Sequence, residues 1–263
     1  MTLRVTSIVH FSLSIIMGAI SVATLFFIEK FPTPGPFIII LITGLSMISL
    51  GLFHINRRGE NRSFFIILST ATLLAFASIL LIIEHSLIRT STILLSGVAM
   101  FILTEHVLHA KNAGIMDFTI KPLRRMVMMI LAFQAFAFSS TLYALNLFFP
   151  AFSFWIVAII EGCIFSLLAF AIWRMYFQIS LSRAWLWCFI ISFAMLELVW
   201  VIHLLPFGYF ISGFIASWLW YLLQLFIRFH LSPQRIIWKK QRIFLIVSGI
   251  LLILFSLLFI RWI

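Results

Sequence analysis

Residues 152–173 read FSFWIVAIIEGCIFSLLAFAIW, and this stretch decides the class of fold. Glu161 is its only charged residue. A helix needs about 20 residues to cross a hydrocarbon core of roughly 30 Å, so the stretch predicts a transmembrane helix. Eight other stretches of the chain share this character. The nine predicted spans are 5–28, 36–56, 63–84, 90–110, 125–147, 152–173, 184–205, 207–229 and 243–260.

The composition agrees with a membrane protein over the whole length. Of the 263 residues, 64% are hydrophobic and only 10% are charged, more apolar surface than a water-soluble globule could bury. The longest predicted connection, 111–124, is too short for a soluble domain. We therefore predict an all-α integral membrane bundle of about nine transmembrane helices, forming a single transmembrane domain over residues 1–263.

Basic residues alternate between the connections. The N-terminus and every second gap hold 15 of the 18 Lys and Arg residues, and the opposite side holds only Lys30, Arg89 and Arg261. Because basic loops stay on the cytoplasmic side, we expect the N-terminus on the cytoplasmic side of the cell membrane and the C-terminus on the outer side. The net charge of +11 then reflects topology and attraction of the inner loops to anionic lipid, so nucleic acid is not implied.

A weak internal duplication divides the spans into two groups of four. Four crossings per half would make the two repeats parallel, with repeats at 1–120 and 121–232 and an extra helix at 233–263. The alternative is that shared hydropathy alone produces the similarity. The matched pairs are Phe31-Pro32 with Phe149-Pro150, Gly44 with Gly162, and Ser96-Gly97 with Ser212-Gly213.

Two acids lie near the middle of predicted spans, Glu161 in the sixth and Glu197 in the seventh. A carboxyl at this depth must be protonated, paired or exposed to water inside the bundle. We expect both to face the interior and at least one to be neutral at pH 7, which makes them candidates for a substrate, proton or cation site. The structural alternative is a neutral carboxyl hydrogen-bonded to the fifth span, for example to Gln134 or Asn146.

A second group of polar residues lies at the cytoplasmic end of the fourth span. Glu105 and His109 are four residues apart, and His106 and His109 are three apart, so their side chains can meet on one helix face. His10 and His54 should lie at a similar depth. Together these residues are candidate ligands for zinc, iron or haem. The alternative is that these histidines bind no metal and simply lie at the partly hydrated membrane interface.

Several catalytic motifs are absent from the sequence. No P-loop occurs, which argues against ATP hydrolysis by this chain, and no G-x-S-x-G elbow occurs. Asp117 is the only aspartate, which excludes proteolysis by a pair of intramembrane aspartates.

One pattern in the seventh and eighth spans resembles known sequences. It is similar to a pattern found in uncharacterised polytopic membrane protein families of bacteria with reduced genomes. The resemblance implies a bacterial cytoplasmic membrane and carries no activity. The residues are Glu197-Leu-Val-Trp200, Leu205-Pro206, Gly208, Gly213, Tyr221 and Arg228.

Three classes of function fit these observations. The first is a transporter- or permease-like protein that moves a small solute past Glu161 and Glu197. The second is a membrane-embedded metal or haem enzyme that uses the histidine cluster, and the third is a structural or assembly subunit. The sequence names no substrate, cofactor, protein partner or oligomeric state.

Overall fold

The computed structural model describes residues 2–55, 62–110, 121–177, 179–231 and 238–259. These residues form nine α-helices joined by short connections, and no strand occurs among them. This confirms the predicted all-α helical bundle. The chain divides into two compact units, Met1–Gln134 (unit 1) and Ala135–Ile263 (unit 2), and the boundary falls inside one helix. The repeats at 1–120 and 121–232 and the extra helix at 233–263 remain a prediction.

Unit 1 is built from four helices and the first half of a fifth. Its most extensive packing joins α1 to α4, where the Ser21 and Ser96 hydroxyls form a buried hydrogen bond of 3.1 Å. A second buried bond, of 2.6 Å, runs from Gln134 Nε2 to Thr72 Oγ1 on α3. Both bonds satisfy polar groups where neither water nor lipid could do so. The helices are α1 (Thr2–Lys30), α2 (Pro34–Ile55), α3 (Arg62–Ile82), α4 (Ser86–Ala110) and α5 (Lys121–Phe148).

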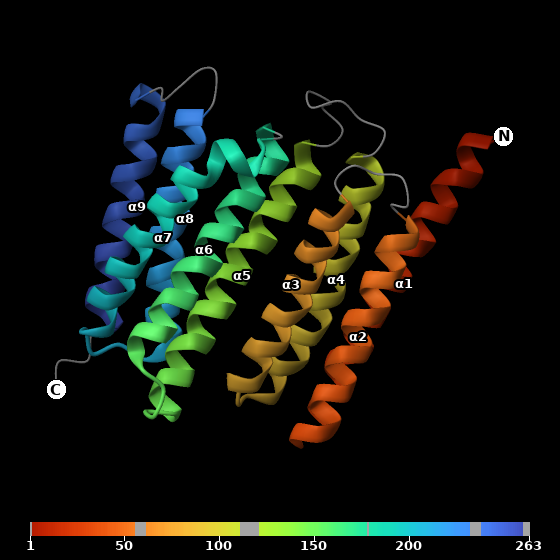
Figure 1. Cartoon of the computed structure of the whole chain (residues 1–263), viewed down its shortest axis with the longest axis horizontal. Coiled ribbons are helices and arrows are strands. Elements are labelled where there is room, and N and C mark those ends of the chain that lie inside the picture. Colours follow the sequence, from red (N-terminus) through yellow and green to blue (C-terminus); the bar gives the residue numbers. More distant parts are fainter. Residues whose placement is uncertain (1, 56–61, 111–120, 178, 232–237, 260–263) are drawn as a thin grey trace. The chain divides into compact units, whose positions relative to one another are not determined.

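Unit 2 contains the second half of α5 and four further helices. The helices α6 and α7 share its largest packing surface, α8 lies against α7, and Trp218 Nε1 of α8 donates to Ser248 Oγ of α9 at 2.7 Å. The connections 149–153 and 204–208 lie at the same end, which we call the hairpin end of unit 2 (Figure 1). The helices are α6 (Phe154–Phe177), α7 (Leu181–His203), α8 (Tyr209–Leu231) and α9 (Trp238–Phe259).

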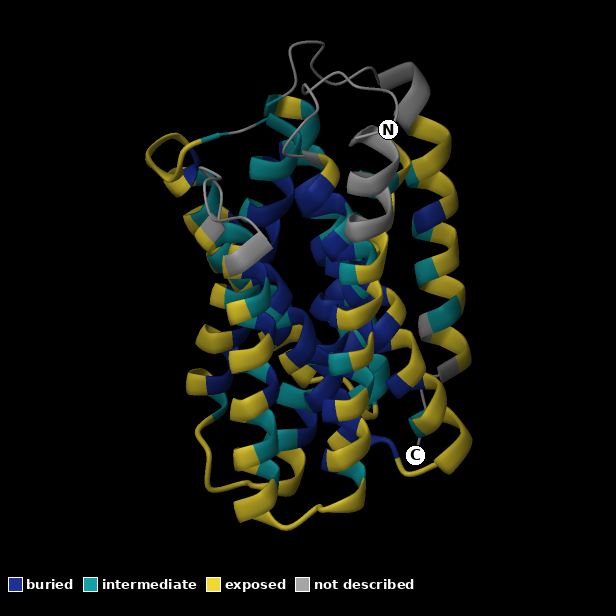
Figure 2. Cartoon of the chain, turned by 90° about the vertical axis from the view of Figure 1, so that its right-hand side faces the viewer, coloured by how far each residue is buried: buried dark blue, intermediate teal, exposed yellow. Residues whose placement is uncertain are grey.

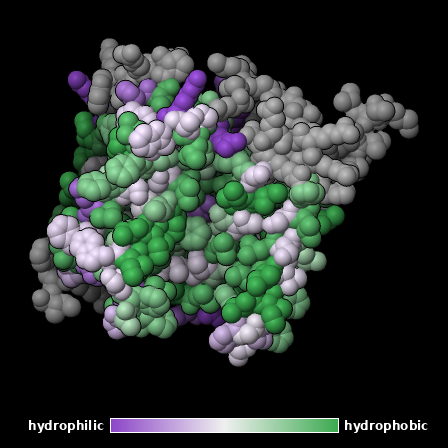
Figure 3. Space-filling view, viewed as in Figure 1, coloured by the Kyte–Doolittle hydropathy of each residue, from purple (hydrophilic) through white to green (hydrophobic). Residues whose placement is uncertain are grey.

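The helix surfaces are those of a membrane protein. Eight of the described helices, α1 to α8, are long and apolar enough to cross a bilayer, whereas α9 contributes a shorter apolar run, Arg242–Phe255. Buried residues line the inner faces of the helices, and exposed residues occupy the opposite faces (Figure 2). Apolar residues cover much of the exposed surface in the view of Figure 3. Large side chains such as Ile39, 65% exposed, and Leu167, 66% exposed, would be unfavourable in water.

Candidate functional site

Glu161 is the most enclosed acid among the described residues. It lies in α6, seven residues after the first residue of the helix, and is only 2% exposed. At a rise of 1.5 Å per residue, this is about 10 Å from the hairpin end. Its Oε1 accepts a hydrogen bond from the Ser139 hydroxyl of α5. The other carboxyl oxygen, Oε2, is buried without a hydrogen-bond partner in the described structure.

Tyr143 lies one helical turn nearer the hairpin end than Ser139, on the same face of α5. Its hydroxyl donates to the backbone carbonyl of Val199 on α7 at 3.1 Å, and its side chain is close enough to Glu161 for an electrostatic interaction. Tyr143 therefore joins α5 to α7 directly beside the buried acid.

Two glycines allow the neighbouring helices to approach this site. A Cβ on Gly162 would lie 2.8 Å from the backbone oxygen of Ser192, so α6 and α7 touch through the backbone next to Glu161. A Cβ on Gly213 of α8 would lie 2.5 Å from the backbone nitrogen of Ser140. Close contacts through small residues are typical of helices packed in membranes.

A pocket of about 390 Å³ lies at the hairpin end, and Tyr143 is the residue of this cluster that lines it. Its lining combines the buried residues Tyr143, Ile202 and Ser212 with Pro150, Leu205 and Phe207 of the two connections. Its volume lies in the range of small-molecule sites, and three of its lining side chains are Tyr or Phe. The lining residues are Tyr143, Asn146, Leu147, Pro150, Ile202, His203, Leu205, Phe207, Tyr209 and Ser212.

The environment of Glu161 differs in one detail from the expected one. The fifth span does supply a partner, but this partner is Ser139. Gln134 instead donates to Thr72, and Asn146 lines the pocket. Sequence reasoning missed Ser139, Tyr143 and His203. Ser139 and Tyr143 lie four residues apart within an apolar span, and this spacing could have indicated a polar helix face.

Glu197 does not lie where we expected it. It is exposed on the surface of α7, so the prediction that both acids face the interior is correct for Glu161 and wrong for Glu197. The contact at Gly162 sets the rotation of α7, because it turns Ser192 toward α6 and leaves Met195 and Val199 buried. Glu197 is two residues from each of the latter, about 200° around the helix, and therefore points outward.

The histidine cluster shows only part of the expected arrangement. His109 Nδ1 lies 3.3 Å from Glu105 Oε2, whereas His106 is buried against the Phe65 ring, with neither ring nitrogen hydrogen-bonded to a described residue. Within the described residues, no three His, Cys, Asp or Glu side chains are placed to share a metal ion. The side chains of His10 and His54 lie outside the described part. The metal or haem site therefore remains a prediction.

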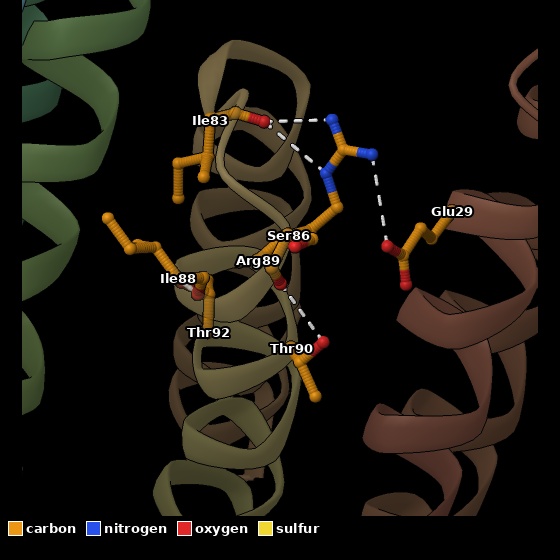
Figure 4. A network of polar contacts seen from close by, with 7 residues as sticks. All are labelled: Glu29, Ile83, Ser86, Ile88, Arg89, Thr90 and Thr92. Carbon is orange, nitrogen blue, oxygen red and sulfur yellow. Dashed lines mark hydrogen bonds and ion pairs between the residues drawn. The ribbon is translucent and has the colours of Figure 1, made fainter.

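A separate polar network closes one end of unit 1. The Arg89 guanidinium donates to the Ile83 carbonyl at the end of α3, with the shorter bond at 2.9 Å, and lies 3.8 Å from the Glu29 carboxylate of α1 (Figure 4). Both charged side chains are partly exposed, so their ion pair contributes little to stability. This network holds the connection between α3 and α4 against the end of α1.

No protein-family model, curated protein or solved structure matches this chain.

Proposed function

We propose that this chain is a transporter- or permease-like protein that exchanges a small organic cation for a proton at Glu161. The observation that carries the proposal is the buried Glu161 carboxyl, which has one oxygen without a partner and lies close to Tyr143, a residue that lines the pocket. In this proposal a solute of small-molecule size enters at the hairpin end and reaches Glu161 past Tyr143.

The chemistry of exchange follows from the cost of burying charge. An ionised carboxylate enclosed by apolar side chains is strongly unfavourable unless a cation lies close. With the pocket empty, the neutral acid is the favourable form. When a cation enters, it stabilises the carboxylate, and the proton leaves. Because such coupling is reciprocal, protonation of Glu161 weakens cation binding by the same factor, as a proton-coupled carrier requires.

The aromatic lining favours an organic cation over a hydrated metal ion. Tyr143, Phe207 and Tyr209 line the pocket, and none of the lining residues is an Asp or Glu that would supply a carboxylate ligand to a metal ion. Quaternary ammonium groups bind in such surroundings because their charge is diffuse and weakly hydrated.

The membrane location and the orientation of the chain are part of the same proposal. We infer a bacterial cytoplasmic membrane, an inner N-terminus and an outer C-terminus from the distribution of basic residues and the resemblance in the seventh and eighth spans. Attraction of the inner loops to anionic lipid fits the same orientation. The alternatives are a metal or haem enzyme, which lacks a described ligand group, and a structural subunit, which the Ser139 bond to Glu161 would also suit.

Transport of radiolabelled tetraethylammonium tests the proposal. Purified protein is reconstituted into vesicles with an acidic lumen, so that outward proton flow can drive the cation inward. We expect uptake that nigericin abolishes and that Glu161→Gln removes, because the amide cannot ionise. Glu197→Gln is the matched control, since it makes the same change at a similar distance from the hairpin end and lies outside the pocket. Uptake that is absent in the wild type, or unchanged in Glu161→Gln, would overturn the proposal.

A further inference from the structure

Glu197 lies within an exposed face of α7 that has the spacing of a helix-packing seam. This face, the α7 seam, is defined by residues three or four positions apart: Leu186, Ile190, Phe193, Glu197 and Trp200. Phe193 is 55% exposed and Trp200 is 45% exposed. In the most apolar 18-residue window of α7 only 22% of the residues are buried, compared with 56% for α6 and 50% for α8. The α7 seam is therefore a large aromatic surface with an acid within it.

An acid in this position needs a polar partner from outside the described fold. Glu197 lies six residues before the end of α7, about 9 Å into the helix. Acyl chains offer no hydrogen bonds, so a carboxyl that faces them is unfavourable in either protonation state. Within the described helices, every Lys and Arg lies in the first or last five residues of its helix. None of the basic residues in the described helices therefore lies at the depth of Glu197.

We propose that the α7 seam is a self-association surface on which a second copy of this chain packs. Two copies inserted in the same orientation are related by a twofold axis along the membrane normal. Each α7 residue near the axis then meets its own counterpart at the same depth. Two neutral Glu197 carboxyls can donate to and accept from each other, so the pair satisfies both acids without a cation.

The spacing of the seam and the chemistry of Glu197 have separate roles in this interface. Alternating intervals of three and four residues suit a left-handed helix pair, the commonest crossing in membranes. The apolar seam residues gain little from association, because lipid is as apolar as a partner helix. The acid pair supplies the preference for a second copy over lipid and fixes the register, as a buried polar residue does in a coiled coil.

Cysteine cross-linking in reconstituted vesicles tests this proposal independently of transport. Cys163 and Cys188, both free in the structure, are first replaced by alanine. Phe193→Cys then places a thiol in the seam, about 15 Å from the hairpin end, and Ile160→Cys places one on an exposed face of α6, about 9 Å from that end. After copper–phenanthroline oxidation, we expect at least about fivefold more covalent dimer from Phe193→Cys than from Ile160→Cys.

Replacing the acid separates specific pairing from random collision. In the Phe193→Cys background, Glu197→Leu should lower dimer yield about fivefold, whereas Glu197→Gln should preserve it, because two amides can also pair. Circular dichroism of each variant identifies any loss of helix. Equal yields from Phe193→Cys and Ile160→Cys would overturn the proposal. So would a yield that Glu197→Leu leaves unchanged, or cross-linking that occurs only to a different protein in native membranes.

Discussion

Replacing Ser139 with alanine removes the one hydrogen bond that the described structure gives to the Glu161 carboxyl. Oε2 already has no partner, so the variant leaves both oxygens unsatisfied in an enclosed site. An unsatisfied buried polar group costs about 1–3 kcal/mol, and measured polar couplings between membrane helices average about 0.6 and reach about 1.7 kcal/mol. We expect Ser139→Ala to lower the free energy of unfolding by about 1.5 kcal/mol.

A double-mutant cycle isolates this bond from the other effects of the substitution. In a Glu161→Leu background no carboxyl remains to be satisfied, so Ser139→Ala should cost about 1 kcal/mol less than in the wild type. Ser166 supplies the matched control, because its hydroxyl donates to the Cys188 carbonyl at 2.8 Å and not to Glu161. The Ser166→Ala and Glu161→Leu pair should be additive within about 0.5 kcal/mol.

The assay is reversible unfolding of the detergent-solubilised protein by sodium dodecyl sulfate, followed by circular dichroism. A Ser139–Glu161 coupling below about 0.3 kcal/mol, or one no larger than that of the Ser166 control, would refute the view that this bond holds the acid in place.

Three further predictions concern packing, topology and metal. Gly162→Ala should lower the free energy of unfolding by about 1–3 kcal/mol, because the new methyl group meets the α7 backbone. Gly249→Ala should not lower it measurably, because no atom lies within 4 Å of the added methyl group. Equal effects of the two substitutions in an unfolding titration would contradict this. In a variant whose two cysteines are replaced by alanine, Ser180→Cys should react with a membrane-impermeant maleimide only from the cytoplasmic side, and Phe149→Cys only from outside. The reverse pattern of labelling would overturn the predicted orientation. His109→Ala should leave the zinc and iron content of purified protein unchanged, and loss of near-stoichiometric metal in elemental analysis would instead support the ligand cluster.

The burial of Glu161 could be predicted because an acid within a long apolar segment has few stable environments. Its partner could not, because several polar residues of α5 lie within one or two turns of the same depth. The choice of Ser139 over Asn146 depends on how far α5 and α6 are shifted along each other. That shift follows from packing contacts between residues distant in sequence, and no local pattern contains it.

The error at Glu197 has a different physical origin. Hydropathy treats the two acids alike, since both lie within long apolar segments. The segment around Glu197 is apolar on all sides, so its sequence does not reveal which face packs inward. Contacts with other helices, such as the approach of Gly162 to Ser192 and the bond from Tyr143 to Val199, fix the rotation of α7 and turn Glu197 outward.

The glycines that the predicted duplication pairs make contacts that can be compared one by one. Gly97 of α4 contacts Gly18 of α1, the first helix of unit 1, and Gly213 of α8 contacts Ser140 of α5. The sequence pairs Gly97 with Gly213, and each meets the first helix of its group of four. The other glycine pair behaves differently, since Gly44 meets α1 whereas Gly162 meets α7. The matched glycines therefore do not pack alike throughout, and the duplication remains a prediction.

Proton release on cation binding tests the exchange at Glu161 most directly. Purified protein in weakly buffered detergent solution is titrated with tetraethylammonium, while a pH indicator records protons and equilibrium dialysis records bound cation. The exchange predicts close to one proton released per cation bound in the wild type and in Glu197→Gln, and no release in Glu161→Gln. Cation binding without proton release in the wild type, or equal release from Glu161→Gln, would contradict it.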